Sequence, residues 1–248
     1  MKYATIESQL GAELCTVEDT EEITALRAQK AWAALGTALC AQYRYREAAD
    51  AFGKALRETP EDLLLLQRFA GANLTLRRFV QAKEAYRKCL ALGAPKEKIA
   101  YPLGVAYDLE GAYGKAAEAF AQCYPCDEEQ EIANLYWHTL SACRAGIPTE
   151  LLGTYREGMQ IGHHIAYEQT VRLFLGRITA QEALAWLAQE RDELNIVIGA
   201  YGICGYLESR GRTEDCLRLR EALLTHTTFW PCISYLAAWN DANPGKEA

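Results

Sequence analysis

The sequence predicts an all-α protein, an α-α superhelix built from helical hairpins. Three observations indicate this fold class. Apolar residues recur at three- and four-residue spacing along most of the chain, and strand patterns are nearly absent. In addition, a pattern of small and aromatic residues returns every 34 residues. Hairpins repeated at such a period bury their apolar faces against their neighbours, so about three units are needed and the end units are atypical.

The repeat is clearest over 29–130, which divides into the units 29–62, 63–96 and 97–130. Each unit contains two amphipathic segments of about 14 residues, joined by a short turn that is expected at 43–45, 77–79 and 111–113 in the three units. Small residues recur at two places and an aromatic residue at a third: Gly36, Ala70 and Gly104, then Ala48, Ala82 and Ala116, then Phe52, Tyr86 and Phe120. We expect the small residues where two helices cross closely. We expect the aromatic rings to fill the space between successive hairpins.

The first unit resembles a tetratricopeptide repeat (TPR), whose signature runs W-x2-L-G-x2-Y, then A-x3-F, then P. The matching residues are Trp32, Leu35, Gly36, Ala48, Phe52, Ala55 and Pro60, and the departure is Leu39 at the Tyr place. The second and third units are looser but in register. The resemblance covers 29–130 and implies a TPR-type solenoid. In that family the first helices line a concave groove that binds a peptide or a protein segment.

The remaining chain is predicted to be helical but irregular. Residues 1–28 are expected to form an N-terminal helical cap, in which Asp19 and Glu22 resemble a capping box. Residues 131–248 are expected to form degenerate TPR-like hairpins and a C-terminal capping helix. The expected segments are a helix over 132–145, a loose connection over 153–162, hairpins over 164–191 and 195–225, a last helix over about 228–240, and a polar tail over 243–248.

Composition argues against several classes of partner. The formal net charge is −7, whereas binding to phosphate backbones needs a basic surface, so we expect no nucleic-acid partner. No apolar run approaches the length of a membrane span, and no signal peptide opens the chain, so we expect no membrane partner and a cytoplasmic location. The nine cysteines are an odd, dispersed set, which favours reduced thiols.

Two motifs have the residue types of a chemical site. Cys123 and Cys126 have the C-x-x-C spacing of thiol oxidoreductases, but they follow a predicted helix rather than begin one, so packing explains them better. His163 and His164 are adjacent, and on a helix they would point about 100° apart and could not both chelate from one face. We therefore expect surface or capping histidines, with a metal site built from one of them and a distant carboxylate as the alternative. No nucleotide-binding, hydrolase or zinc-protease motif occurs. We therefore expect no catalysis, no cofactor and no metal.

The TPR resemblance selects the groove residues. They are Lys30, Thr37, Gln67, Arg68, Lys98, Tyr101, Val105, Asp108, Tyr136 and Thr139, with Ala33, Cys40, Leu64 and Gly71 on the same helix faces. The chaperone-binding subclass of the family uses a set of Lys, Arg and Asn side chains, and of these only Lys98 is present here, so that subclass is rejected. Arg68 would bind carboxylates and Tyr101 and Tyr136 would anchor apolar groups, unless these tyrosines only pack between repeats.

The leading hypothesis is a non-catalytic scaffold or adaptor that binds an acidic and apolar peptide or protein segment in this groove. One alternative is a sensor with a ligand or peptide pocket in the C-terminal half, around 150–200. A second is an enzyme that uses the thiol pair or the histidines. A third is a homo-oligomer formed through the C-terminal hairpins, where Trp230 and Trp239 end the chain of helices.

Overall fold

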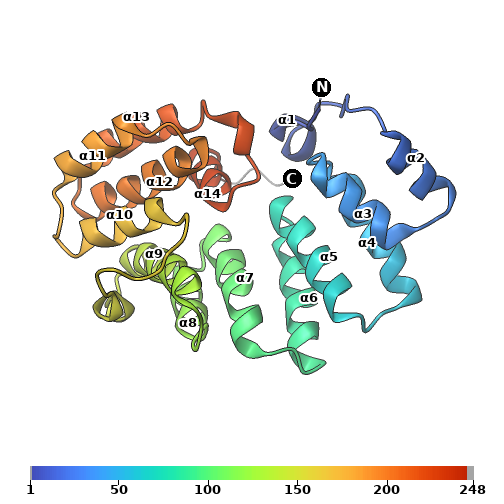
Figure 1. Cartoon of the computed structure of the whole chain (residues 1–248), viewed down its shortest axis with the longest axis horizontal. Coiled ribbons are helices and arrows are strands. Elements are labelled where there is room, and N and C mark those ends of the chain that lie inside the picture. Colours follow the sequence, from blue (N-terminus) through green and yellow to red (C-terminus); the bar gives the residue numbers. More distant parts are fainter. Residues whose placement is uncertain (1, 245–248) are drawn as a thin grey trace. The chain divides into compact units, whose positions relative to one another are not determined.

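The computed structural model describes residues 2–244. This part of the chain consists of α-helices and short 3-10 helices without strands (Figure 1). None of its helices combines the length and the apolar character needed to cross a bilayer. It divides into two compact units, unit 1 over 2–102 and unit 2 over 103–244. The division falls inside α7 (Lys96–Leu109), beside Pro102, which lacks the N–H that would continue the helical hydrogen bonds.

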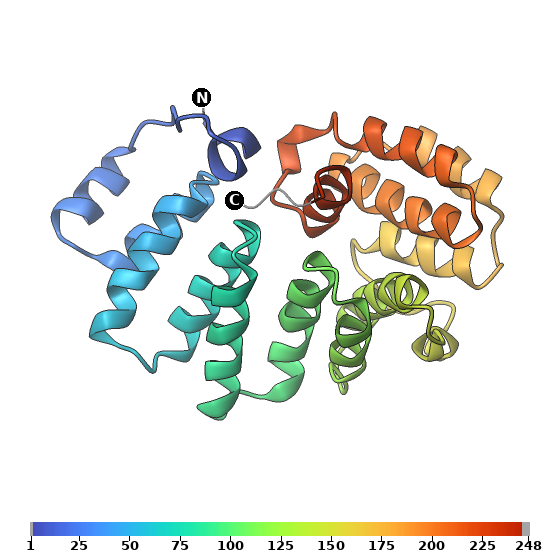
Figure 2. The same cartoon turned by 180° about the vertical axis from the view of Figure 1, so that it is seen from behind.

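Unit 1 consists of consecutive helices that pack on their neighbours. Their bounds are α1 (Ile6–Leu10), α2 (Glu21–Ala28), α3 (Trp32–Ala41), α4 (Tyr45–Glu58), α5 (Leu63–Thr75), α6 (Phe79–Ala91) and the first part of α7. α3 packs against α4, α4 against α5, and α5 against α6. Both faces of the unit show these helices side by side (Figures 1 and 2). The predicted helical segments of the first two repeats are confirmed.

The 34-residue period is visible in the backbone. The second helix of each repeat begins at Tyr45, at Phe79 and, in α8 (Tyr113–Ala121), at Tyr113, which are 34 residues apart. Two residues earlier the backbone is left-handed each time, with φ of 61° at Tyr43, 58° at Arg77 and 83° at Gly111. The three turns therefore share one geometry, which ends the first helix and redirects the chain. The predicted positions of all three turns are confirmed.

Close packing of the repeated aromatic residue explains the small residue before it. A Cβ atom added to Gly36 would lie 2.5 Å from Cε1 of Phe52, and one added to Gly104 would lie 2.8 Å from Cε1 of Phe120. The prediction of a close crossing at these glycines is confirmed. Each ring covers the glycine of its own hairpin, however, so its packing is not confined to the space between successive hairpins as predicted.

The N-terminal cap differs from the predicted capping box. The residue that caps α2 is Thr20, whose Oγ1 accepts a hydrogen bond from Ile23 N at 3.2 Å. Asp19 instead forms ion pairs with Arg44 at 2.6 Å and Arg27 at 3.0 Å. The prediction for Asp19 is therefore wrong by one residue, because the two nearby arginines attract its carboxylate away from the helix end.

Unit 2 contains the rest of the chain. Its elements are the end of α7, α8, α9 (Glu128–Ala145), the 3-10 helix η1 (Glu150–Thr154), α10 (Ile165–Phe174), α11 (Ala180–Gln189), α12 (Glu193–Ser209), α13 (Thr213–Leu223), the 3-10 helix η2 (Thr227–Phe229) and α14 (Ile233–Ala242). The predicted hairpins correspond to α10 with α11 and α12 with α13. α9 begins earlier than predicted because Asp127 caps it, and the last helix begins later. Part of the predicted tail, 245–248, lies outside the described residues.

α12 is the central helix of unit 2 and packs against α9, α10, α11, α13 and α14. Glycines on it let its neighbours approach, in the pairs Gly199 with Trp186, Gly202 with Thr170, and Gly205 with Leu140. Any Cβ atom at these positions would overlap the paired side chain, so their small size is a packing requirement. No local sequence pattern marks this role.

Candidate functional site

An open hollow lies on unit 1 where α3, α4 and α5 meet. Its volume is about 310 Å³, and its lining combines apolar surface with a few polar groups. The lining residues are Thr37, Cys40, Tyr45, Phe52, Arg68, Gly71, Ala72 and Thr75. On each first helix these residues follow three- and four-residue spacing, which places them on one face. We call this surface the α3–α5 hollow.

Arg68 supplies the positive charge of the hollow. Its Nη1 donates a hydrogen bond to Thr37 Oγ1 at 3.1 Å, and Thr37 Oγ1 donates to the carbonyl oxygen of Ala33 at 3.1 Å. No carboxylate among the described residues forms an ion pair with Arg68. A guanidinium has five N–H donors, so most of those on Arg68 remain available to a ligand.

The floor of the hollow is apolar and has spare room. Phe52 is buried beneath it, and a Cβ atom added to Gly71 would meet no other atom within 4 Å. Burial raises the pKa of the Cys40 thiol to about 11, although the charge of Arg68 acts in the opposite direction. The thiol is therefore protonated at neutral pH and forms part of the apolar surface.

Of the six predicted binding residues of unit 1, Thr37 and Arg68 line this hollow, together with Cys40 and Gly71 from the same predicted helix faces. The other four lie outside its lining: Lys30 is exposed between α2 and α3, Gln67 donates to the carbonyl oxygen of Leu63 at 3.2 Å, Lys98 is exposed in the first turn of α7, and Tyr101 is half-buried.

The predicted groove residues of unit 2 are not open to a partner. Val105, Asp108, Tyr136 and Thr139 are all buried, with exposures between 0% and 3%. Tyr136 shows why, since its hydroxyl donates to the carbonyl oxygen of Ile198 on α12 at 2.9 Å. These four predictions are corrected: the helices that follow cover the surface that the repeat pattern alone would leave open.

Asp108 belongs instead to a buried charge network centred on Arg144. Its Oδ1 accepts a hydrogen bond from Ser141 Oγ at 2.7 Å. Burial raises the pKa of Asp108 to about 6, against the opposing attraction of Arg144. Arg144 pairs with Asp241 at 2.6 Å and donates to the hydroxyl of Tyr201 at 2.7 Å.

The network extends to α13. Arg220 pairs with Glu208 at 2.6 Å, and Glu208 also lies 3.4 Å from Arg144. The ion pairs therefore connect α9, α12, α13 and α14 and hold these helices together.

The first thiol of the C-x-x-C pair lacks the features of a nucleophile. Cys123 is fully buried after α8, and burial raises the pKa of its thiol to about 12. A reactive cysteine requires a depressed pKa and access to solvent, and Cys123 has neither. Cys126 is half-buried and accepts a hydrogen bond from Nδ2 of Asn134 at 3.5 Å. The full burial of Cys123 agrees with its predicted packing role.

The two adjacent histidines do not lie on one helix. They occupy the turn before α10, where His164 is the N-cap residue. Their rings are stacked, with centroids 4.3 Å apart. The expected divergence does not occur, because it assumed helical geometry at both residues, whereas the exposed position of His163 and the N-cap position of His164 agree with the surface or capping roles predicted for them.

The hollow also contains residues that the groove prediction omitted. Tyr45 and Phe52 come from α4, a second helix of the repeat, whereas the family resemblance directs attention to first helices only. Thr75 lies one turn beyond Gly71 on α5. Extending the three- and four-residue spacing by one turn would have found Thr75, but no sequence signal places Tyr45 at the hollow.

Comparison with protein-family models and with curated protein sequences finds no match for this chain.

Proposed function

We propose that this protein is a non-catalytic adaptor with a TPR-type solenoid of helical hairpins, whose α3–α5 hollow binds a segment of another protein. The observation that carries the proposal is Arg68, a cation at the edge of an apolar hollow that forms no ion pair with any described residue. The preferred segment combines a carboxylate for Arg68 with a neighbouring apolar side chain for the floor.

The size of the hollow supports a side chain as its occupant. A cavity of about 150 Å³ accommodates benzene, so the hollow at about 310 Å³ has room for one large aliphatic or aromatic side chain and part of its backbone. Pockets for whole small molecules begin at about 300 Å³ and enclose most of the ligand. The α3–α5 hollow is at this lower limit and is open, which favours one anchoring side chain of a longer chain.

The chemistry of Arg68 supports a carboxylate beside that anchor. A guanidinium binds a carboxylate through two parallel hydrogen bonds, and charge-assisted bonds are about twice as strong as neutral ones. Thr37 holds the guanidinium at the rim through a 3.1 Å hydrogen bond, which reduces the conformational freedom lost on binding. The repeated turns at Tyr43, Arg77 and Gly111 support the solenoid part of the proposal.

The test begins with selection of peptides from a random displayed library on the wild-type protein. We expect enriched peptides to place Asp or Glu near Leu, Phe or Met. A selected peptide should lose at least about tenfold in affinity for the variant Arg68→Glu, which corresponds to 1.4 kcal/mol. The control is Lys88→Glu, the same charge reversal at an exposed residue of α6, which should bind as the wild type does.

A second comparison separates the contribution of the Arg68 charge to peptide affinity from that of the apolar floor. Replacing the acidic residue of the peptide by its amide should weaken binding to wild type but should change little for Arg68→Ala. Equal affinity of wild type and Arg68→Glu for every selected peptide would refute binding at this site.

A further inference from the structure

A cluster of three metal-ligating side chains lies in unit 2, apart from the α3–α5 hollow. It consists of Glu129 in the first turn of α9 and His163 and His164 in the turn before α10. One ligand atom of each residue lies within 4.8 Å of those of the other two. Glu129 and His163 are exposed and His164 is half-buried, so an ion can reach the cluster from solvent.

The side chain of Glu129 lies close to the histidines because it packs against the glycine that precedes them, Gly162. Gly162 adopts a left-handed conformation with φ of 55°, and a Cβ atom there would overlap Oε1 of Glu129. Only glycine combines this conformation with so close an approach. The carboxylate of Glu129 forms no hydrogen bond or ion pair with any described residue, so its oxygens are available to an ion.

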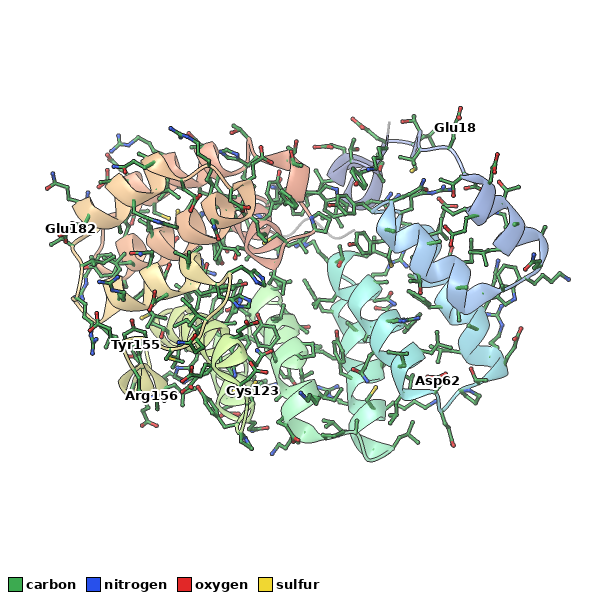
Figure 3. The ribbon with its side chains drawn as sticks, viewed as in Figure 1. Glu18, Asp62, Cys123, Tyr155, Arg156 and Glu182 are labelled. Carbon is green, nitrogen blue, oxygen red and sulfur yellow. The ribbon has the colours of Figure 1, made fainter. Side chains whose placement is uncertain are left out.

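Contacts beside the cluster hold the histidine turn against α9. The backbone N–H of Gln160 donates to Oε2 of Glu128 at 2.6 Å. Arg156 pairs with Glu128 at 3.3 Å and with Glu131 at 2.8 Å, and Figure 3 shows Arg156 on the segment that follows η1. These bonds hold the segment before the histidines against the start of α9 before any ion binds. Less conformational entropy is therefore lost on binding.

One ring nitrogen of His164 has a backbone contact of the kind that supports a metal ligand. Its Nδ1 lies 3.1 Å from the carbonyl oxygen of Ile161. When Nδ1–H donates to that oxygen, the lone pair is on Nε2, and such a bond from the second ring nitrogen is the usual support of a ligating histidine. The ring of His163 stacks on it, so both imidazoles lie on the same side of the turn.

The charges around the cluster favour a cation. Asp127, Glu128, Glu129 and Glu131 surround the start of α9, and Arg156 pairs with Glu128 and Glu131 only. Each helix start has the equivalent of roughly half a positive charge, which opposes a cation. The full charge of Glu129, as a direct ligand, exceeds that partial charge.

We propose that Glu129, His163 and His164 form a binding site for a borderline divalent transition-metal ion, of which Zn²⁺ is the representative. Two imidazole nitrogens and one carboxylate oxygen suit Zn²⁺ rather than Mg²⁺ or Ca²⁺, which prefer oxygen ligands. Zinc ligands at about 2.0–2.2 Å lie roughly 3.3 Å from one another in a tetrahedral site. Binding therefore requires the three ligand atoms, now within 4.8 Å of one another, to move closer together. The ion ties the turn before α10 to α9 and leaves a coordination position for water.

The test is calorimetric titration of the full chain with Zn²⁺ alone. We expect one tight equivalent for wild type, a loss of at least about tenfold in affinity for Glu129→Gln, His163→Ala and His164→Ala, and no response to Mg²⁺. The matched control is His226→Ala, which removes a histidine outside the cluster and should bind Zn²⁺ as the wild type does. Unchanged thermal unfolding of each metal-free variant shows that the fold is intact.

Co²⁺ distinguishes this site from binding by the nine cysteines. A site with nitrogen and oxygen ligands gives weak visible bands, whereas thiolate ligands add an intense near-ultraviolet charge-transfer band. Hydrogen exchange in 158–164 should slow when Zn²⁺ is added to wild type but not to His164→Ala. A thiolate band, equal zinc affinity of all variants, or no tight equivalent in wild type would overturn the proposal.

Discussion

Thr37, Gly71 and Val105 occupy the same place in successive 34-residue units, yet their surroundings differ. Thr37 is exposed and Gly71 borders the open α3–α5 hollow, whereas Val105 is fully buried in unit 2. Cys40 and Asp108 also share a place, and the first lines the hollow while the second is buried against Ser141 of α9. The repeat determines which helix face a residue is on. The helices that follow determine whether that face stays open.

The coverage in unit 2 comes from elements outside the regular repeats. Asn240 of α14 donates through Nδ2 to the carbonyl oxygen of Leu109 at 3.0 Å, and α12 packs on α9. Unit 2 therefore uses its repeat faces for internal packing, with a charge network among them. Unit 1 leaves the corresponding face available, and this difference is the basis for placing peptide binding there.

The largest expected effect contrasts two arginines. Arg144→Ala should destabilise the protein by about 3–5 kcal/mol, because Asp241 and its neighbours would remain charged in a largely buried position. Arg68→Ala should change stability by less than about 0.5 kcal/mol, because the side chain is exposed and forms no ion pair within the described part of the chain. Urea unfolding followed by circular dichroism measures both. A loss of stability for Arg144→Ala as small as that for Arg68→Ala would show that the charge network is not structural.

The next comparison uses two helical glycines. Gly202→Ala should cost about 3 kcal/mol, because its Cβ atom would overlap Thr170 and would lie 2.7 Å from Cε2 of Tyr136. Gly71→Ala should instead stabilise by about 0.5–1 kcal/mol, since its Cβ atom meets nothing within 4 Å and alanine favours the helix.

The same unfolding measurement compares these two variants, and Gly71→Leu adds a functional arm. The larger side chain should fill the α3–α5 hollow and weaken the selected peptides while the fold is retained. Destabilisation by Gly71→Ala as large as that by Gly202→Ala would contradict the assignment of one face as open and the other as packed.

The sequence predicted the features that depend on local pattern. The hairpin turns at Tyr43, Arg77 and Gly111 follow from the period, because a shared turn geometry recurs wherever the same places recur. The pair formed by Thr37 and Arg68 followed from helical spacing within two units. Local pattern was thus sufficient for most helices and for part of the hollow.

The errors concern contacts between residues distant in the chain. The burial of Tyr136 depends on where α12 packs, and no pattern around Tyr136 contains that information. Glu129 meets His163 and His164 because the loop after η1 returns to the start of α9, held there by Glu128. Helical geometry was the wrong assumption for the histidines, since their turn contains Gly162 with φ of 55°.

The smallest expected effect concerns pH and the Asp108 carboxyl group. Its pKa is raised by burial from 3.8 to about 6 in the folded chain. Between these values the folded state holds a proton that the unfolded state has released, so the stability of wild type falls as pH rises through this range. Above about pH 6 the loss is complete.

Asp108→Asn should remove this pH dependence while its Oδ1 still accepts the hydrogen bond from Ser141. The stability of the variant relative to wild type should therefore increase by about 2 kcal/mol between pH 4.5 and pH 7.5, since one unit of pKa corresponds to 1.36 kcal/mol. Urea unfolding of both proteins at the two pH values measures the difference, and titrations common to both cancel. A stability difference that is the same at both pH values would mean that Asp108 has the same pKa in the folded and the unfolded chain. Burial in unit 2 would then not destabilise the charged carboxylate.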